Sequence, residues 1–75
     1  MQLDDLVTGQ MVKLRNGRIY MVLRNTMYGS ILTHTKYNNI RLDKYYADMT
    51  YDGSENYDIC KVYNPDNYNT VHSNN

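Results

Sequence analysis

The side chains best suited to covalent chemistry are few, and they are scattered along the 75-residue chain. A hydrolase or transferase needs a nucleophile, a base and an orienting group held together, and the candidates are Cys60, His34 and His72. Cys60 lies in an apolar run typical of a strand, where a thiol is more often a small core residue than a nucleophile. Two histidines and one cysteine without short spacing do not form a zinc signature. We therefore predict that the protein is not an enzyme and that it uses no metal or other cofactor.

Carboxylates give no stronger signal for catalysis. Asp48, Asp52 and Asp58 fall in or near expected loops, and nothing marks two of them as an acid–base pair. Solvated surface is the default position for such side chains. The sequence also lacks the glycine-rich patterns of phosphate and dinucleotide sites and the spacing of a calcium loop. These observations leave binding as the expected function.

Residues 11–23 contain the clearest structural signal. Asn16-Gly17 separates two alternating runs, which predicts a β-hairpin with a two-residue type I′ turn. That turn would pair Leu14 with Ile19 and would sort every side chain to one face of the hairpin. The predicted core face consists of Val12, Leu14, Ile19, Met21 and Leu23. The predicted outer face consists of Lys13, Arg15, Arg18 and Tyr20, with Met11 and Val22 at its far end.

The sequence contains two candidate binding surfaces. The first predicted partner-binding surface consists of Lys13, Arg15, Arg18, Tyr20, Arg24, Tyr28 and Arg41. The second, in the acidic half of the chain, consists of Tyr45, Tyr46, Asp48, Tyr51 and Asp52. Structural explanations remain open for the first surface. Lys13 opposite Tyr20 can simply stabilise the hairpin, and water can screen Arg15 opposite Arg18 at a hairpin tip.

Composition narrows the kind of partner. The chain has nine tyrosines, no phenylalanine and no tryptophan, so some tyrosines must lie on the surface. Tyrosine, arginine and methionine are typical of protein–protein interfaces, although tyrosine also suits strands and cross-strand pairs. Net charge is zero, but residues 6–42 contain six basic and no acidic side chains. Zero net charge argues against nucleic acid as the main partner, whereas a small nucleotide needs only a local pocket.

The elements that must position these side chains are short. We expect strands at 11–15, 18–24, 31–35, 40–42 and 57–63, a loop at 25–30, and a helical turn at 3–7. Leu42, Tyr45, Tyr46 and Met49 repeat at helical spacing, which predicts one or two further helical turns. This pattern predicts a mostly β protein, a small antiparallel SH3-like or OB-like barrel of about five strands with one short helical turn. Residues 1–63 would form one domain and residues 64–75 a polar tail.

Parts of the chain resemble small uncharacterised proteins of phages and prophages of Gram-positive bacteria. The resemblance rests on residues 6–17 (LVTGQMVKLRNG), 20–23 (YMVL) and 57–63 (YDICKVY). It implies an accessory role in infection, such as inhibition of CRISPR or another defence, or sequestration of a nucleotide signal. It assigns no residue a function.

These inferences predict a non-enzymatic protein of the host-cell cytoplasm that inhibits a host defence component by direct protein–protein binding. The alternative is a module that binds nucleic acid or a small nucleotide through arginine, lysine and tyrosine. No membrane partner is expected. Self-association is a further alternative, because the predicted register exposes Met11 and Val22.

Overall fold

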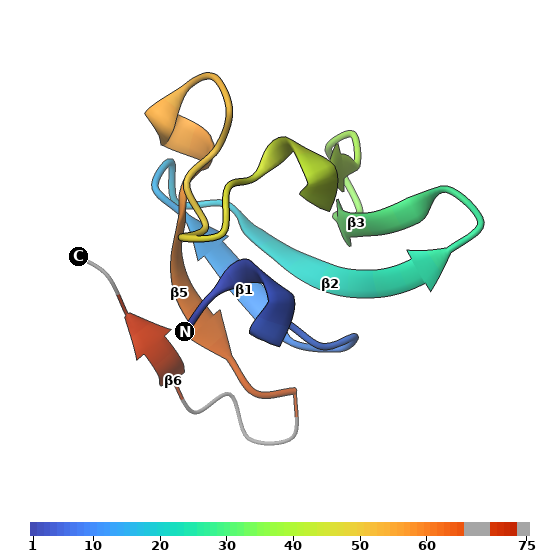
Figure 1. Ribbon diagram of the computed structural model, residues 1–75, viewed down its shortest axis with the longest axis horizontal. Coiled ribbons are helices and arrows are strands. Elements are labelled where there is room, and N and C mark those ends of the chain that lie inside the picture. Colours follow the sequence, from blue (N-terminus) through green and yellow to red (C-terminus); the bar gives the residue numbers. More distant parts are fainter. Residues whose placement is uncertain (66–69, 74–75) are drawn as a thin grey trace.

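Six short strands form a single antiparallel sheet in the computed structural model, which describes residues 1–65 and 70–73 (Figure 1). The strands are β1 (Met11–Leu14), β2 (Ile19–Thr26), β3 (Gly29–Thr33), β4 (Ile40–Arg41), β5 (Ile59–Tyr63) and β6 (Thr70–Ser73). Their order in the sheet is β4-β3-β2-β1-β5-β6. The only helical elements among the described residues are the 3₁₀ turns η1 (Leu3–Asp5), η2 (Leu42–Lys44) and η3 (Glu55–Tyr57). The predicted mostly β fold is confirmed, but β4 and β6 remain as sheet edges, so the closed barrel stays a prediction.

The β1–β2 hairpin differs from the prediction by one residue. The Gly17 N–H donates to the Leu14 carbonyl oxygen at 2.9 Å, and the Leu14 N–H donates to the Arg18 carbonyl oxygen at 2.9 Å. Gly17 has φ +91°, whereas Asn16 is not among the described non-glycine residues with positive φ. This is a three-residue loop, a type I turn followed by a left-handed glycine, in place of the two-residue type I′ turn. The Asn16 side chain favours it by accepting from the Arg18 N–H at 2.9 Å.

The changed loop exchanges the two faces of β2. Val12 now lies opposite Tyr20, and Met11 lies opposite Met21. Tyr20 is buried, while Ile19 and Met21 are 44% and 39% exposed. The predicted core positions of Ile19 and Met21, and the predicted surface position of Tyr20, are therefore wrong. A shift of one residue is enough, because side chains alternate between faces with a period of two.

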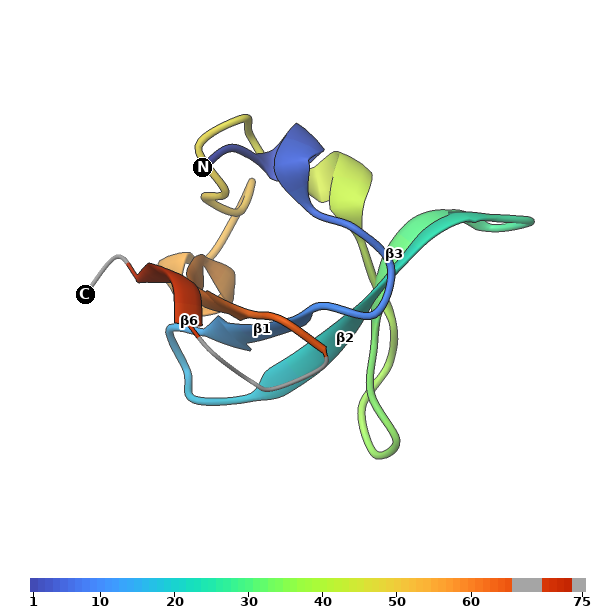
Figure 2. The same ribbon diagram turned by 90° about the horizontal axis from the view of Figure 1, so that it is seen from below.

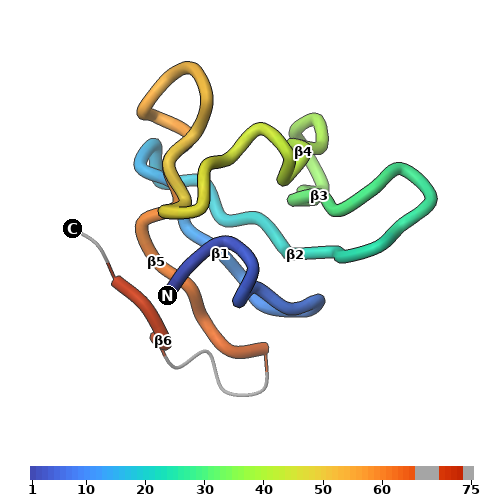
Figure 3. The backbone as a smooth tube through the Cα atoms, viewed as in Figure 1, coloured from blue at the N-terminus to red at the C-terminus, as the bar shows by residue number. Residues whose placement is uncertain are grey.

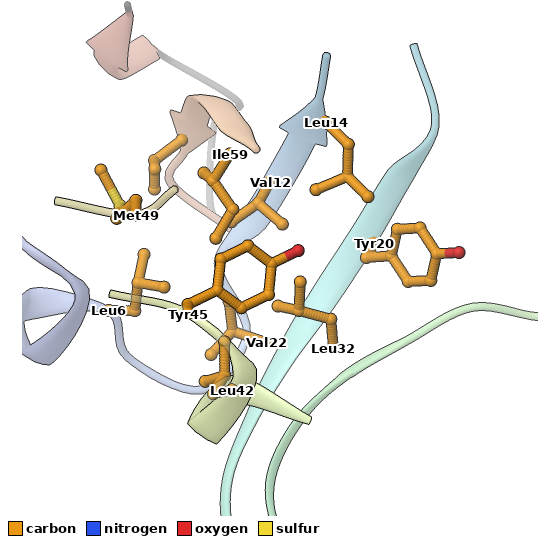
Figure 4. Close-up of a cluster of buried hydrophobic side chains, with 11 residues drawn as sticks. Leu6, Val12, Leu14, Tyr20, Val22, Leu32, Leu42, Tyr45, Met49 and Ile59 are labelled. Atoms are coloured by element: carbon orange, nitrogen blue, oxygen red, sulfur yellow. The ribbon is translucent and has the colours of Figure 1, made fainter. Parts of the chain in front are cut away.

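The core lies between one face of the sheet and the segments that cross it. Figure 2 shows η1 and the segment after β4 on one side of the strands. The fully buried side chains come from both layers (Figure 4). They include Leu6, Val12, Leu14, Tyr20, Val22, Leu32, Met49 and Val62. Burial of each valine or leucine stabilises the fold by about 1.5–3 kcal/mol, so this cluster fixes which face of the sheet turns inward.

The segment between β4 and β5 is not the helix that its spacing predicted beyond η2. Leu42, Tyr45 and Met49 are buried, whereas Tyr46 is 56% exposed. The Met49 N–H donates to the Tyr46 carbonyl oxygen at 2.9 Å, and Met49 has φ +71°. A tight turn therefore brings Tyr45 opposite Tyr51 in an antiparallel bridge. The turn reverses the chain, which Figure 3 shows as the sharp yellow bend between the segment after β4 and the start of β5.

Two further expectations need correction. The predicted loop at 25–30 is mostly strand, because β2 continues to Thr26 and β3 begins at Gly29. The predicted tail contributes β6, which pairs with β5. Residues 66–69 and 74–75 of that tail lie outside the described residues. In the described ranges no helix is long and apolar enough to cross a bilayer.

Candidate binding surfaces

Three arginines of the first predicted surface contact groups of the same chain. Arg15 Nη2 lies 3.6 Å from Asp58 Oδ2, and Arg41 Nη2 lies 2.7 Å from Asp43 Oδ2. Arg24 Nη1 donates to the Leu3 carbonyl oxygen at 3.4 Å. The pKa of Asp43 is lowered, chiefly by the hydrogen bond from Arg41. These three cations have intramolecular partners and do not define one interface.

The other members of that predicted surface lie in three different places. Lys13 points to the outer side of the sheet, because its neighbours Val12 and Leu14 are buried on the inner side. Tyr28 is 72% exposed at the tip of the β2–β3 hairpin. Arg18 and Tyr20 lie on the inner side. The seven residues therefore do not form a single surface.

The outer sheet face is the first of two candidate sites. Strand register arranges its side chains in two rows, one of Tyr63, Met11, Met21 and Thr33, the other of Lys61, Lys13 and Ile19. Figure 2 shows η1 and the segment after β4 on the opposite side of the sheet. Part of this face is hollowed into a depression of about 250 Å³, whose lining includes Met11, Ile19 and Met21. Exposed apolar area of this kind is typical of an interaction surface.

Lys13 and Lys61 distinguish this face electrostatically. They are directly opposite each other in the β1–β5 register, and both are half-buried. Within the part of the chain that the structure describes, neither has a carboxylate within 4 Å. Like charges opposite each other destabilise a sheet. The face thus concentrates positive charge next to exposed apolar side chains.

The second candidate site is a tyrosine pocket on the inner side, at the end of the sheet near η3. It has a volume of about 310 Å³. Its lining includes Arg18, Tyr20, Tyr37, Tyr51 and Tyr57. Two ring clusters meet there. Tyr51 packs against Tyr57 with ring centroids 5.2 Å apart, and His34 lies between Tyr20 and Tyr37 at 5.1 and 4.7 Å.

The second predicted surface is divided by burial. Tyr45 is buried, its hydroxyl donates to the Tyr57 carbonyl oxygen at 2.7 Å, and desolvation raises its pKa. Tyr51 is half-buried and lines the tyrosine pocket. Tyr46, Asp48 and Asp52 are exposed. The Tyr46 hydroxyl donates to Asp52 Oδ1 at 2.8 Å. Asp48 accepts from the Thr50 hydroxyl and N–H, and these bonds lower its pKa.

The three side chains considered for catalysis are not gathered into a site. Cys60 is buried as the extra residue of a bulge, since Lys61 lies opposite Lys13 and Ile59 lies opposite Leu14. His34 Nδ1 accepts from the Lys36 N–H at 2.9 Å, and His72 lies opposite Val62. Among the described residues no group of histidine, cysteine, aspartate and glutamate is arranged to hold a metal ion.

Sequence reasoning did not assign Lys61, Tyr37 or Tyr57 to a binding surface. Lys61 would have followed from a correct pairing of β5 with β1, which depends on the bulge at Cys60. Tyr37 and Tyr57 reach the pocket from a loop and from η3, far apart in sequence. No local pattern brings such residues together.

Comparisons with protein-family models, with curated proteins and with solved structures find no match.

Proposed function

We propose that the protein is a non-enzymatic binding protein that inhibits a partner protein by covering part of its surface with the outer sheet face. The observation that supports this best is the Lys13–Lys61 pair beside Ile19 and Met21. Two ammonium groups that face each other without a nearby carboxylate destabilise a sheet, so the stability of the fold does not explain this pair. An approaching anionic group relieves their repulsion, and the apolar side chains provide area to bury.

The charge on this face also indicates the chemistry of the partner. An apolar segment flanked by aspartate or glutamate would complement both rows of the face. A second copy of the chain is a poorer fit. A two-fold contact over this face would bring two Lys13–Lys61 pairs together, and buried like charges oppose association. Val22, one of the two residues behind the expectation of self-association, is buried.

Two finer statements belong to this proposal. The order β4-β3-β2-β1-β5, with η3 immediately before β5, supports an SH3-like arrangement of the strands. The resemblance to phage proteins supports a host defence protein as the target and the host cytoplasm as the place of action. In this form the protein would act by occupying the target's surface, with no reaction of its own.

A co-purification experiment with matched variants tests the proposal. The full chain would be used to capture proteins from a lysate of the native host. The bait variants would be Lys13→Glu/Lys61→Glu and, separately, Met21→Asp. We expect one protein to be recovered in stoichiometric amount with the unmodified chain and to be lost with both variants. Loss of a central contact of this kind weakens binding by about 2 kcal/mol or more.

The controls change similar side chains elsewhere. Lys36→Glu/Lys44→Glu makes the same change in net charge at exposed positions, and Met27→Asp alters a methionine that is 88% exposed. Both control baits should retain the partner. Retention of the partner by Lys13→Glu/Lys61→Glu, or its equal loss with the control baits, would remove the outer sheet face from consideration.

A further inference from the structure

We propose that the tyrosine pocket binds a small nucleotide, with the base against the tyrosine rings and the phosphate on Arg18. This inference does not depend on a protein partner at the outer sheet face, because Arg18 and the pocket lie on the inner side of the sheet. It rests on the charge of the pocket, on its rings and on its polar groups.

Charge decides between an anionic and a cationic ligand. Among the described residues, the lining of the pocket contains no acidic side chain, and its one formal charge is the guanidinium of Arg18. Arg18 Cζ lies 3.7 Å from the centroid of the Tyr37 ring. Within the described residues Arg18 has no carboxylate within 4 Å. A quaternary ammonium ligand would be repelled by this guanidinium, although tyrosine rings alone would attract it. A phosphate fits, because a guanidinium offers it paired N–H donors.

The geometry of Arg18 favours a ligand that has both a planar and an anionic part. Stacking on Tyr37 fixes the plane of the guanidinium and leaves its edge as the donor surface. Fixing the side chain in advance lowers the conformational entropy that is lost on binding. The other tyrosine rings line the same pocket as this cation. They offer further contact area for a flat group attached to the phosphate.

The tyrosine rings provide that area. Tyr51 and Tyr57 are inclined at 50° to each other, so their faces are not closed by parallel stacking. Stacking of a base on an aromatic side chain contributes about 1–3 kcal/mol. A volume of about 310 Å³ is at the lower end of the range for small-molecule pockets. This volume suits a single nucleotide better than an oligonucleotide.

Polar groups at the pocket can recognise the edge of a base. Asn38 and Asn39 line it, and their amides both donate and accept hydrogen bonds. In Figure 4 the ring of Tyr20 lies at the margin of the buried cluster, with its hydroxyl directed away from it. Among the described residues this hydroxyl has no hydrogen-bond partner, yet no buried side-chain polar atom is unsatisfied. The Tyr20 hydroxyl therefore keeps some contact with solvent, but Tyr20 is only 1% exposed and forms part of the wall of the pocket.

Titration of the isotope-labelled full chain tests this inference. The probes are the four nucleoside 5′-monophosphates, adenosine and inorganic phosphate, each followed by NMR and calorimetry. We expect at least one monophosphate to bind and to shift the signals of Arg18, Tyr37 and Tyr57. Adenosine and inorganic phosphate should bind at least about tenfold more weakly, because each lacks half of the contacts. Equal binding of inorganic phosphate, or no binding of any monophosphate up to about 1 mM, would overturn the proposal.

Variants and a second probe sharpen the result. Arg18→Gln should weaken binding of the monophosphate at least about tenfold, whereas Lys36→Gln, an exposed cation in the same region, should change it less than about twofold. If Arg18→Gln does not fold, the signals that shift in the unmodified chain still locate the site. Shifts confined to residues outside the pocket would refute it. A short single-stranded oligonucleotide that binds much more tightly, with a strong salt dependence, would refute a small ligand in favour of nucleic acid.

Discussion

The outer sheet face and the tyrosine pocket place positive charge in opposite settings. In the pocket, the guanidinium of Arg18 already lies against a ring, so the arrangement is stable before any ligand arrives. On the outer sheet face, Lys13 and Lys61 lie opposite each other with no described carboxylate in reach. The cation of the pocket is therefore positioned before a ligand binds. On the outer sheet face, the repulsion between the two lysines is not offset by a described carboxylate. A small ligand suits the pocket, and a large partner that brings its own carboxylates suits the outer sheet face.

Adjacent residues of β2 belong to these different sites, so the hairpin register separates them. The largest expected effect tests that register. Tyr20→Ala should lower the free energy of unfolding by about 3 kcal/mol, because it empties a buried ring position. Ile19→Ala, on the outer sheet face, should lower it by less than about 1 kcal/mol. Urea unfolding followed by circular dichroism measures both.

The opposite ranking would restore the two-residue turn and would exchange the two sites. With Ile19 in the core and Tyr20 outside, Ile19→Ala would be the more damaging change. Asn16→Ala adds a second test of the loop. It removes the oxygen that accepts the Arg18 N–H at 2.9 Å and should be mildly destabilising.

The register also marks the limit of what the sequence could predict. Alternation, turn residues and β-branched side chains correctly predict a mostly β chain and the approximate position of most strands. They do not determine loop length, because Asn-Gly suits both a type I′ turn and a type I turn with a left-handed glycine. Tyr20 and Ile19 are each compatible with either face of a strand. The choice depends on which side chains meet η1 and the β4–β5 segment, which is a tertiary effect.

The residues that make up the candidate sites were harder to predict from the sequence than the fold was. Lys13, Arg18 and Tyr51 belong both to the predicted surfaces and to the candidate sites of the structure, but the sequence grouped them by distance along the chain rather than by face. The pocket needs Tyr37 and Tyr57, which only the folded chain brings together. The like-charge pair needs Lys61, whose partner depends on the Cys60 bulge. Long-range pairing and bulges therefore account for most of what was missed.

The dependence of Tm on pH distinguishes the buried Tyr45 from exposed tyrosines, and we expect an effect of intermediate size. Burial raises the pKa of Tyr45 above the ordinary value of 10.0. The unfolded chain then loses this proton at a lower pH than the folded chain, so the stabilising contribution is complete below about pH 10 and is lost as the pH rises further. We expect the Tm of the unmodified chain to fall more steeply above pH 10 than that of Tyr45→Phe.

Tyr28→Phe is the matched control, because Tyr28 is 72% exposed at a hairpin tip. Its Tm should follow that of the unmodified chain at every pH. At neutral pH, Tyr45→Phe should be about 1 kcal/mol less stable, since the Tyr57 carbonyl oxygen loses its donor. Parallel Tm curves for Tyr45→Phe and the unmodified chain above pH 10 would show that burial of Tyr45 does not control this transition.

The smallest expected effect bears most directly on the purpose of the outer sheet face. Lys61→Glu replaces a like-charge pair with an attractive one opposite Lys13, and should raise the free energy of unfolding by about 0.5 kcal/mol. Lys44→Glu, at an exposed position on η2, should change it by less. Urea unfolding at low and high salt measures the difference, which salt should reduce. A substitution that stabilises the fold but abolishes partner capture identifies a side chain kept for binding, because folding alone would favour its replacement. If Lys61→Glu instead destabilises the chain by as much as a core substitution, Lys61 has a structural role, and its repulsion with Lys13 no longer points to a partner.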